Sequence, residues 1–331
     1  MDQSHSERPA EHRHLPVLLE TSVRLLAPAL QEPGAIHVDA TLGMGGHASA
    51  VLRAAPHARL VGIDRDPQAL ELARERLHRD RVGERATLVH ATYDRIPEVL
   101  EDLGLPGAHA VMMDLGLSSF QIDTPDRGFS YAVDAPLDMR MDPSSDGPTA
   151  ADLLRELPEA ELARILRDLG DERFAKRIAR RLVAQRQQAP LTRSGELVEL
   201  LEQSIPAASR ASGGHPAKRT FQALRIAVNE ELEILASAVE SALDCLHVDG
   251  RIVVESYHSG EDRLVKTAFT RRTRSSAPPG FPVELEEHKP TFSALVRGAL
   301  QADDTERDTN SRAASVRLRA LTRTRPDQGA H

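Results

Sequence analysis

The sequence predicts an α/β protein with a Rossmann-like, largely parallel sheet and an inserted all-helical domain. Short apolar runs alternate with helical patterns through the first third of the chain, as in a parallel sheet covered on both faces. A glycine-rich turn follows the first run, where the first strand of such a sheet passes into its helix. Residues 150–245 then show helical patterns alone, and an apolar run returns at 249–257.

Four strands and their helices account for the first third of the chain. The strands are predicted from near-continuous apolar runs at residues 35–41, 59–64, 86–92 and 108–116. After the glycine turn, "ASAVLRAA" reads as a helix. The clearest helix start is Asp66 followed by Pro67, because Asp caps helix N-termini and Pro fits the first helical position. Leu70, Ala73 and Leu77 then lie on one apolar face.

The middle of the chain breaks this alternation. Residues 117–149 are rich in Asp, Pro, Ser and Gly, and a loop of that length in a compact protein is usually functional or disordered. A series of helical patterns follows and ends in a long one over 218–243. We therefore expect a helical insertion at 141–228.

The rest of the chain is expected to form one domain around this insertion. Residues 1–140 and 229–331 would supply its sheet and covering helices, and 315–321 alternate as a late, antiparallel strand. The two ends, 1–13 and 324–331, read as disordered tails, and the first of them has no apolar signal region.

Bulk composition is that of an ordinary globular protein. Of its residues, 40% are apolar and 28% are charged. The length of 331 residues exceeds the size at which one hydrophobic core usually stops growing. No window approaches the ~18 uncharged apolar residues of a membrane span, so we expect no membrane partner. The single cysteine, Cys245, excludes an internal disulfide and fits a reducing compartment. We expect a cytoplasmic protein.

Charge is unevenly distributed along the chain. The formal net charge of −8 argues against indiscriminate nucleic-acid binding. Two stretches are nevertheless basic: Arg173, Lys176, Arg177, Arg180, Arg181 and Arg186, then Arg263, Lys266, Arg271, Arg272 and Arg274. Either stretch can be a solvated helix face or a surface for an anionic partner.

The turn "DATLGMGGHA" (39–48) nearly satisfies the dinucleotide fingerprint, and Asp64 stands where a ribose-binding acid belongs. A tight structural corner is the alternative. Two further acids favour S-adenosylmethionine over NAD. Asp39 ends the first strand, where it could reach the ammonium group of a methionine moiety but would repel a pyrophosphate. Asp114 ends the fourth strand, and in an open sheet such strand ends share one crevice.

Longer segments point to one family. They are "HLPVLLE" (14–20), "DATLGMGGHA" (39–48), "GIDRDPQAL" (62–70), "DLGLSSFQID" (114–123), "RGFSY" with "PLDMRMDP" (127–143), "GDERFAKRIAR" (170–180), "HPAKRTFQALRIAVNEEL" (215–232), "SYHSGEDRLVK" (256–266) and "NSRAASVRLRAL" (310–321). Together they resemble the RsmH (MraW) family of S-adenosylmethionine-dependent methyltransferases. The resemblance spans nearly the whole chain and implies a class I methyltransferase sheet. It also implies methylation of the N4 amine of a cytidine in small-subunit (16S) ribosomal RNA.

The resemblance also implies cofactor contacts, on Gly45, Gly46, His47, Asp64, Tyr93, Asp114 and Gln121. The chain departs from the family pattern at a few places. Tyr93 stands where Phe is usual, and Phe120 where Pro is usual. Ser311 and Ala314 replace a Pro and an Arg of the closing motif, which removes one guanidinium available to RNA.

Candidate catalytic residues follow from the reaction so implied. A cytosine amine is a weak nucleophile, so the site must hold it in line with the methyl group and accept its N–H bonds as positive charge builds. Asp114 suits this task at the end of the fourth strand. Asp138, with Arg140, would close over the site or clamp its own loop. His258 would meet the base or a phosphate, or be a satisfied strand-end histidine.

Partners and competing functions complete the expectations. The target base would be splayed out of its stack, with Phe120, Phe129, Tyr131 and Tyr257 as candidate platforms. No Cys/His cluster has metal-ligand spacing, so no metal is expected. The partner would be small-subunit ribosomal RNA within the assembled or assembling small subunit, with free RNA as the alternative, and the enzyme would be a monomer or a homodimer. The alternatives are an NAD-dependent oxidoreductase and a non-catalytic RNA-binding or assembly protein.

Overall fold

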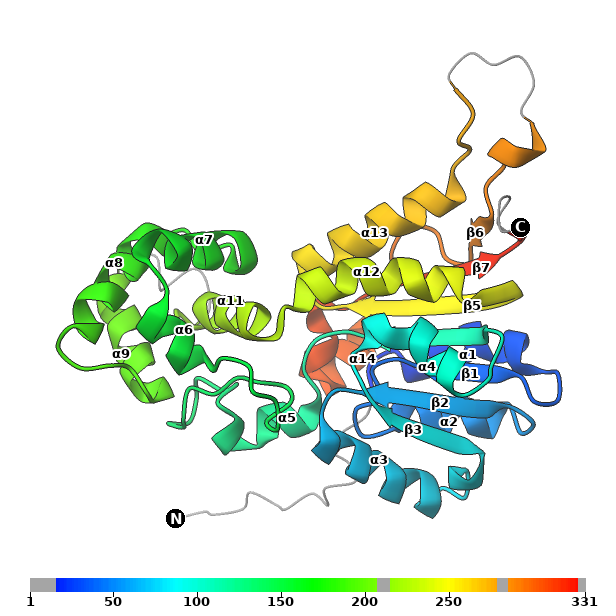
Figure 1. Cartoon of the computed structure of the whole chain (residues 1–331), viewed down its shortest axis with the longest axis horizontal. Helices are drawn as coiled ribbons and strands as arrows, with labels where there is room; N and C mark the ends of the chain where they lie inside the picture. The colour runs from blue at the N-terminus through cyan, green and yellow to red at the C-terminus, as the bar shows by residue number, and fades with distance from the viewer. Residues whose placement is uncertain (1–15, 207–214, 279–284, 327–331) are drawn as a thin grey trace. The chain divides into compact units, whose positions relative to one another are not determined.

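The computed structural model describes residues 16–206, 215–278 and 285–326. The expected tails fall largely outside these ranges: residues 1–13 wholly, and 327–331 of the second. The chain folds into two compact units. The first combines the chain up to Gly116 with the chain from Ile234 onward, and the second is Leu117–Glu233 (Figure 1).

The first unit contains a seven-stranded sheet in the order β3-β2-β1-β4-β5-β7-β6. The strands are β1 (Ile36–Asp39), β2 (Arg59–Asp64), β3 (Ala86–His90), β4 (Ala108–Asp114), β5 (Leu246–Ser256), β6 (Phe292–Ala294) and β7 (Arg317–Arg323). Strands β1 to β5 pair in parallel, and β7 pairs antiparallel with β5 and β6. The predicted Rossmann-like sheet and its late antiparallel strand are confirmed; β6 was not predicted.

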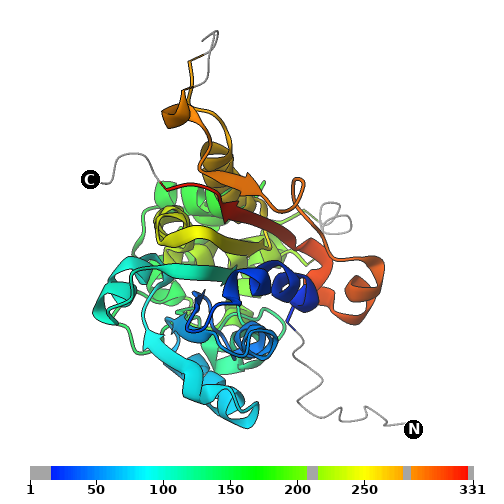
Figure 2. The same cartoon turned by 90° about the vertical axis from the view of Figure 1, so that its right-hand side faces the viewer.

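Helices cover both faces of this sheet (Figures 1 and 2). They are α1 (Leu19–Leu26), α2 (Gly46–Ala54), α3 (Pro67–Arg79), α4 (Ile96–Asp102), α12 (Glu231–Asp244), α13 (Ser259–Thr273) and α14 (Asp304–Thr309). One apolar core packs α4, α12 and α13 against the sheet, and a second packs α1, α2 and α3 against the other face. Asp66 caps α3 as predicted, because its side chain accepts the N–H of Gln68.

The second unit is all-helical around its own apolar core. Its helices are α5 (Ser119–Asp123), α6 (Ala150–Glu156), α7 (Glu159–Gly170), α8 (Ala175–Arg186), α9 (Ser194–Ser204) and α11 (Lys218–Asn229). The unit is wider than the 141–228 insertion expected from sequence. The segment 117–140 belongs to it because Phe129, Leu137 and Met139 lie in the same core as α7, α8 and α11.

The long helical pattern over 218–243 is broken, which the sequence pattern did not indicate. Helix α11 ends at Asn229, Glu230 has a left-handed φ of 51°, and α12 begins at Glu231. The buried Asn229 side chain accepts the N–H of Met141 at 2.7 Å and donates to the carbonyl of Met139 at 2.7 Å. These bonds to a distant loop hold the end of the helix in place.

Replacing Asn229 with Ala should destabilise the second unit by about 3 kcal/mol. The substitution leaves a buried N–H and a buried carbonyl unpaired, at roughly 1–3 kcal/mol each. Denaturant unfolding of the full chain measures the loss. Gln222→Ala on the same helix is the matched control, because Gln222 makes a single 3.4 Å bond to the carbonyl of Leu169. Equal losses from both substitutions would contradict the role of Asn229.

Candidate functional site

Three acids end neighbouring parallel strands at the carboxyl edge of the sheet. Strand β1 lies between β2 and β4, and the three strands end in Asp39, Asp64 and Asp114. The backbone N–H of Asp114 donates to Thr41 Oγ1 at 2.6 Å, which holds the end of β4 to the turn after β1. The sequence prediction that these acids share one edge is therefore confirmed.

The turn between β1 and α2 requires glycine for two different reasons. Gly43 and Gly45 have left-handed φ values of 51° and 72°, which only glycine adopts without strain. Gly46 begins α2, and a Cβ built there would lie 2.5 Å from Pro16 Cγ. Conformation thus requires the first two glycines, and close packing of the N-terminal segment requires the third.

Asp64 is held by the backbone on both sides. Its Oδ2 accepts the N–H of Gly43 at 2.7 Å, and its Oδ1 accepts the N–H of Asp66 at 2.8 Å. Burial raises the pKa of Asp64 to about 6, against these two hydrogen bonds, which lower it. The carboxylate is therefore fixed in orientation at the end of β2, as a ribose-binding acid needs to be.

Asp39 is buried more deeply. Burial raises its pKa to about 7, and the neighbouring Asp114 and Asp64 raise it further, against the N–H of Thr41. Within the described part of the chain, no Lys or Arg forms an ion pair with Asp39, Asp64 or Asp114. An edge with three acids and no paired Lys or Arg among the described residues favours a ligand that carries positive charge.

Asp114 has the most elaborate surroundings. Tyr257 Oη donates to its Oδ1 at 2.7 Å, and His47 Nδ1 lies 3.6 Å from its Oδ2. Burial raises the pKa of Asp114, whereas His47 and the Tyr257 hydroxyl lower it. Glu255, which is opposite Asp114 in the β4–β5 register, is 0% exposed and lies 3.8 Å from His47 Nε2. The donor atoms of His47, Asp114 and Glu255 come within 4.8 Å of one another.

The remaining expected cofactor residues are divided between the units. Tyr93 starts a 3-10 turn directly after β3 and is partly buried against the core of the first unit. Gln121 belongs to the second unit, where it completes the capping box of α5: its N–H donates to Ser118 Oγ, and its Oε1 accepts the N–H of Ser118. Its side-chain oxygen therefore has a structural partner.

His258 caps helix α13. Its Nδ1 accepts the N–H of Gly260 at 3.2 Å, and its Nε2 lies 3.1 Å from Glu261 Oε1. Glu261 in turn accepts the N–H groups of Tyr257 and His258. The Nε2 atom is buried and has no hydrogen-bond partner among the described residues, and a catalytic role for His258 stays a prediction.

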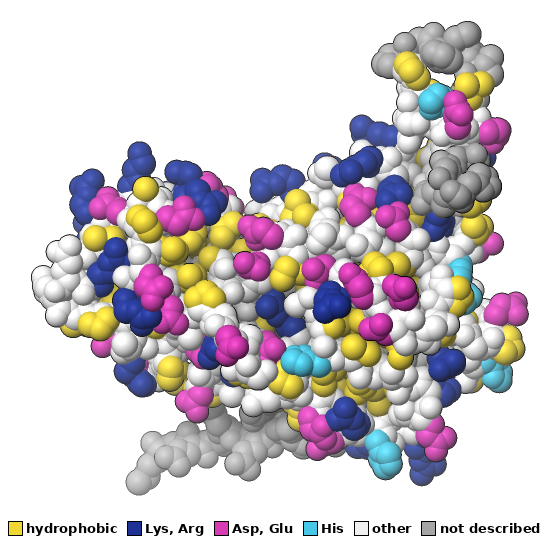
Figure 3. Space-filling view, in the orientation of Figure 1, with side chains coloured by type: hydrophobic (Ala, Val, Ile, Leu, Met, Phe, Trp, Pro, Cys, Tyr) yellow, Lys and Arg dark blue, Asp and Glu magenta, His cyan; other side chains and the backbone are white. Residues whose placement is uncertain are grey.

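Basic side chains of the two expected stretches differ in their availability. In the second unit, Arg186 donates to the carbonyls of Leu154 and Leu157, and Arg181 donates to Gln203. The exposed side chains of the same stretch for which the described structure gives no partner are Arg173, Lys176 and Arg177. In the first unit, α13 exposes Arg263 and Lys266, while Arg271 and Arg272 pair with Glu240. Figure 3 shows Lys and Arg side chains over α7 and α8 and, separately, over α13.

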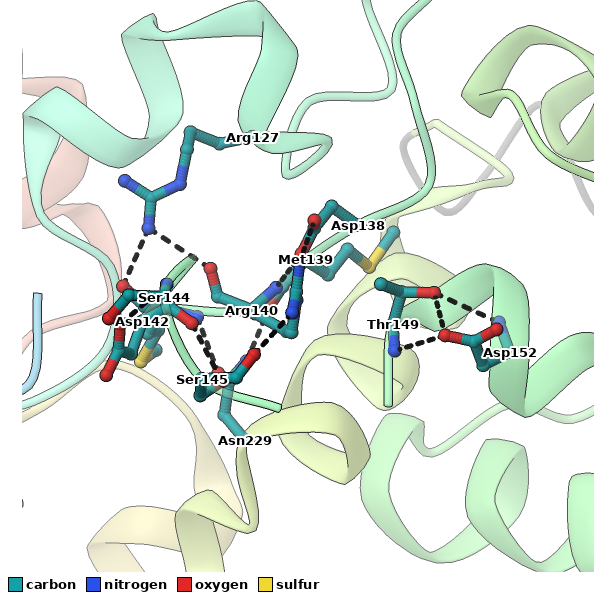
Figure 4. Close-up of polar contacts among 11 residues, drawn as sticks. Arg127, Asp138, Met139, Arg140, Asp142, Ser144, Ser145, Thr149, Asp152 and Asn229 are labelled. Carbon is teal, nitrogen blue, oxygen red and sulfur yellow. Dashed lines mark hydrogen bonds and ion pairs between the residues drawn. The ribbon is translucent and has the colours of Figure 1, made fainter. Parts of the chain in front are cut away.

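The segment "PLDMRMDP" forms a loop held by hydrogen bonds within the second unit (Figure 4). Arg140 Nε and Nη2 donate to the two carboxylate oxygens of Asp138, each at 2.8 Å. Between them Met139 is fully buried with a left-handed φ of 63°. Arg127 donates to the carbonyls of Arg140 and Met141. The loop-clamp interpretation describes these contacts, and a catalytic role for Asp138 stays a prediction.

Aromatic side chains expected as stacking platforms are partly used by the fold. Tyr131 stacks on His215 with ring centroids 4.5 Å apart, and Phe129 is buried in the core of the second unit. The hydroxyl of Tyr257 is bound to Asp114. Phe129 is 8% exposed, so in this conformation it offers little surface for stacking on a substrate base.

Sequence reasoning missed Glu255. The signal was present: Glu255 is an ionisable residue inside the apolar run "RIVVESY", and strands buried on both faces of a parallel sheet seldom carry one without a partner. Its partner was unpredictable, because Ser22 lies 233 residues away and donates from α1 to Glu255 Oε1 at 2.7 Å.

No described helix of the chain is long and apolar enough to cross a membrane.

The model of the MraW methylase family matches residues 11–324. Three curated relatives are named ribosomal RNA small subunit methyltransferase H. The one from Leifsonia xyli subsp. xyli is 59% identical, covering 95% of this chain and 96% of the relative. The one from Beutenbergia cavernae is 59% identical, covering 94% and 93%. The one from Saccharopolyspora erythraea is 57% identical, covering 95% and 94%.

Proposed function

We propose that this chain, which belongs to the MraW methylase family, methylates the N4 amine of a cytidine in small-subunit (16S) ribosomal RNA with S-adenosylmethionine. The observation that carries the proposal is the carboxyl edge of the sheet, where burial raises the pKa values of Asp39, Asp64 and Asp114 and none of the three pairs with a Lys or Arg of the described residues. S-adenosylmethionine would supply both a ribose for Asp64 and the sulfonium and ammonium charges that this edge lacks.

A dinucleotide fits this edge less well. A pyrophosphate at the glycine turn would meet Asp39 and Asp114, and like charges at short range cost free energy in a desolvated site. Melting-temperature shifts separate the two cofactors: S-adenosylmethionine and S-adenosylhomocysteine should stabilise the chain, and NAD should not. Intact acids and an intact glycine turn also weigh against a purely RNA-binding protein.

The chemistry assigned to this chain is positioning and charge stabilisation. The cofactor supplies an electrophilic methyl group when bound. Asp114 would accept a hydrogen bond from an N–H group of the attacking amine, and this contact strengthens as the nitrogen becomes positive. We include Asp138 and His258 in the proposal as further catalytic candidates.

The RNA partner would be met by exposed arginine and lysine, since planar guanidinium groups bind phosphates through two hydrogen bonds. The exposed side chains on α8 are the candidates in the second unit. We place the reaction in the cytoplasm, on RNA that is free or within the small subunit. Transfer of a labelled methyl group to both forms of the substrate tests the function and identifies the form.

Asp64→Ala should weaken S-adenosylmethionine binding at least tenfold, because two charge-assisted hydrogen bonds to the ribose, each worth roughly 1.5–3 kcal/mol, would be lost. The pKa of Asp64 is raised to about 6, so affinity of the wild type should fall as pH drops through that value and the carboxylate takes up a proton. Calorimetry between pH 5 and pH 8 measures both effects. Glu71→Ala on the exposed face of α3 is the control, and unchanged affinity in Asp64→Ala would refute the assignment.

Asp114→Ala should lower the rate at saturating cofactor by ~10²–10⁴, the usual scale for a lost acid–base or electrostatic partner. Asn at this position should be milder, because its carbonyl still accepts a hydrogen bond. Single-turnover methylation at saturating S-adenosylmethionine makes the measurement. Full recovery of the rate at saturation would leave Asp114 as a cofactor ligand only.

Reversing Lys176 and Arg177 to Glu should weaken RNA binding and flatten its dependence on salt, because fewer counterions are released. The control is the reversal of Arg164 and Arg167, which changes the charge of the same unit equally. These two arginines pair with Glu161 and Asp168. RNA binding measured from about 50 to 200 mM salt distinguishes the pairs. Equal slopes for both double variants would show that α8 exposes a solvated face.

A further inference from the structure

A chain of hydrogen bonds runs behind Asp114 into the core of the first unit. Tyr257 Oη is 2.7 Å from Asp114 Oδ1 and 3.3 Å from Glu255 Oε2. Ser22 Oγ donates to the other oxygen of Glu255 at 2.7 Å. Glu255 is fully buried, whereas the Asp114 side chain keeps 28% of its surface exposed at the sheet edge. These hydrogen bonds therefore link a buried acid, Glu255, to a partly exposed acid, Asp114, through the phenol of Tyr257.

The number of protons available to these hydrogen bonds decides whether Glu255 is charged. Tyr257 has one hydroxyl proton, and the shorter contact assigns it to Asp114. The phenol oxygen and Glu255 Oε2 would then face each other with lone pairs alone, unless Glu255 carries a proton on Oε2. A protonated Glu255 donates that proton to Tyr257 Oη and still accepts the hydroxyl of Ser22 on Oε1. The phenol oxygen and both oxygens of Glu255 then each have a partner of the matching donor or acceptor type.

Other charged groups around Glu255 support the same state. His47 on α2 lies 3.8 Å from Glu255 and has its Nε2 3.0 Å from the carbonyl of Val17, a contact in which the ring nitrogen donates. Among the described residues, the other titratable neighbours of Glu255 are Tyr257 and two acids: Asp114 on β4, and Glu306 on α14, which accepts the N–H of Leu18. Asp114 in turn faces Asp39 on β1 and Glu261 on α13.

We propose that Glu255 is a neutral carboxylic acid that donates to Tyr257, and that Tyr257 in turn holds the Asp114 carboxylate in its ionised form and orientation. Glu255 and Tyr257 are thus positioning residues for Asp114. Burial and the charge of Asp114 raise the pKa of Glu255 well above its usual range, which agrees with this arrangement. The protonation state is independent of the proposed function; its effect on methyl transfer rests on that function.

Gln is the substitution that mimics the proposed state. In Glu255→Gln, the amide nitrogen donates to Tyr257 and the amide oxygen accepts from Ser22, as a neutral Glu would. Glu255→Leu removes the donor and keeps an apolar side chain of similar size. Ser256→Ala is the matched control, because Ser256 is equally buried on the same strand and its hydroxyl has no hydrogen-bond partner in the described structure.

Infrared difference spectra of wild type minus Glu255→Gln test the protonation state without any enzymatic assay. At pH 7 we expect the carbonyl band of a neutral carboxylic acid in the wild type. The paired bands of a carboxylate would overturn the proposal. Stabilisation of the wild type by Mn²⁺ or Zn²⁺ that is absent from Glu255→Gln would also overturn it, since an ion held by His47, Asp114 and Glu255 requires an ionised Glu255.

Stability against pH gives a second, independent reading. A carboxyl group whose pKa is raised in the folded state stays protonated there while the unfolded chain releases its proton, so wild-type stability falls as pH rises above the unfolded pKa. Relative to wild type, Glu255→Gln should therefore gain up to tenfold in the folding equilibrium constant for each pH unit, up to the folded pKa. Ser256→Ala should show no such trend. A pH-independent difference for Glu255→Gln would contradict a neutral Glu255.

Single-turnover methylation across pH tests the positioning of Asp114. Loss of the hydroxyl in Tyr257→Phe removes a bond that favours the carboxylate, so the acid limb of the rate profile should move to higher pH by about one unit. Glu255→Leu should move it the same way, and Glu255→Gln should restore the wild-type limb. An unmoved limb in Tyr257→Phe would refute the positioning role. Absence of methyl transfer from the wild type would instead refute the proposed function and leave the infrared result standing.

Discussion

Parallel pairing of β1 with both β2 and β4 decides where the polar groups of this molecule meet. The pairing places Asp39 between Asp64 and Asp114, although the chain separates the three acids widely. Backbone hydrogen bonds from Gly43 and Asp66 and the phenol of Tyr257 then fix two of them in orientation. The same pairing buries the acids partly or wholly, and this burial raises their pKa values. A charged ligand at this edge would therefore interact with groups that are already oriented and desolvated.

The sequence contains enough local information to predict the elements and the edge. Asp66 and Pro67 mark the start of α3 by the chemistry of a helix N-terminus alone, and Asp39, Asp64 and Asp114 follow apolar runs directly. Long-range contacts were out of reach. The break at Glu230 depends on Asn229, which bonds to residues 88 and 90 positions away. The contact between Tyr257 and Asp114 depends on the pairing of β4 with β5, which brings together residues 143 positions apart.

Arginine is abundant in this chain, but several of its guanidinium groups donate hydrogen bonds to backbone carbonyls. Arg85 donates to the carbonyls of Leu52, Ala55 and Ala58, and Arg323 donates to those of Asp244 and Leu246. Such guanidinium groups satisfy the carbonyls left over where helices and strands end. A count of arginines in the sequence therefore overstates the surface available to a nucleic acid, and the side chains that remain exposed on α8 and α13 are a better measure of it.

The interruption of the sheet has a consequence for synthesis. Strand β4 ends at Asp114, and its neighbour β5 begins at Leu246, after the whole second unit. At about 5–20 residues per second, the ribosome takes on the order of ten seconds to produce the intervening chain. During that time one edge of β4 has unpaired N–H and carbonyl groups, and an open edge is a template for pairing with another chain. The helical unit, which has a core of its own, can fold within this interval, whereas the sheet is completed only after β7 has been synthesised.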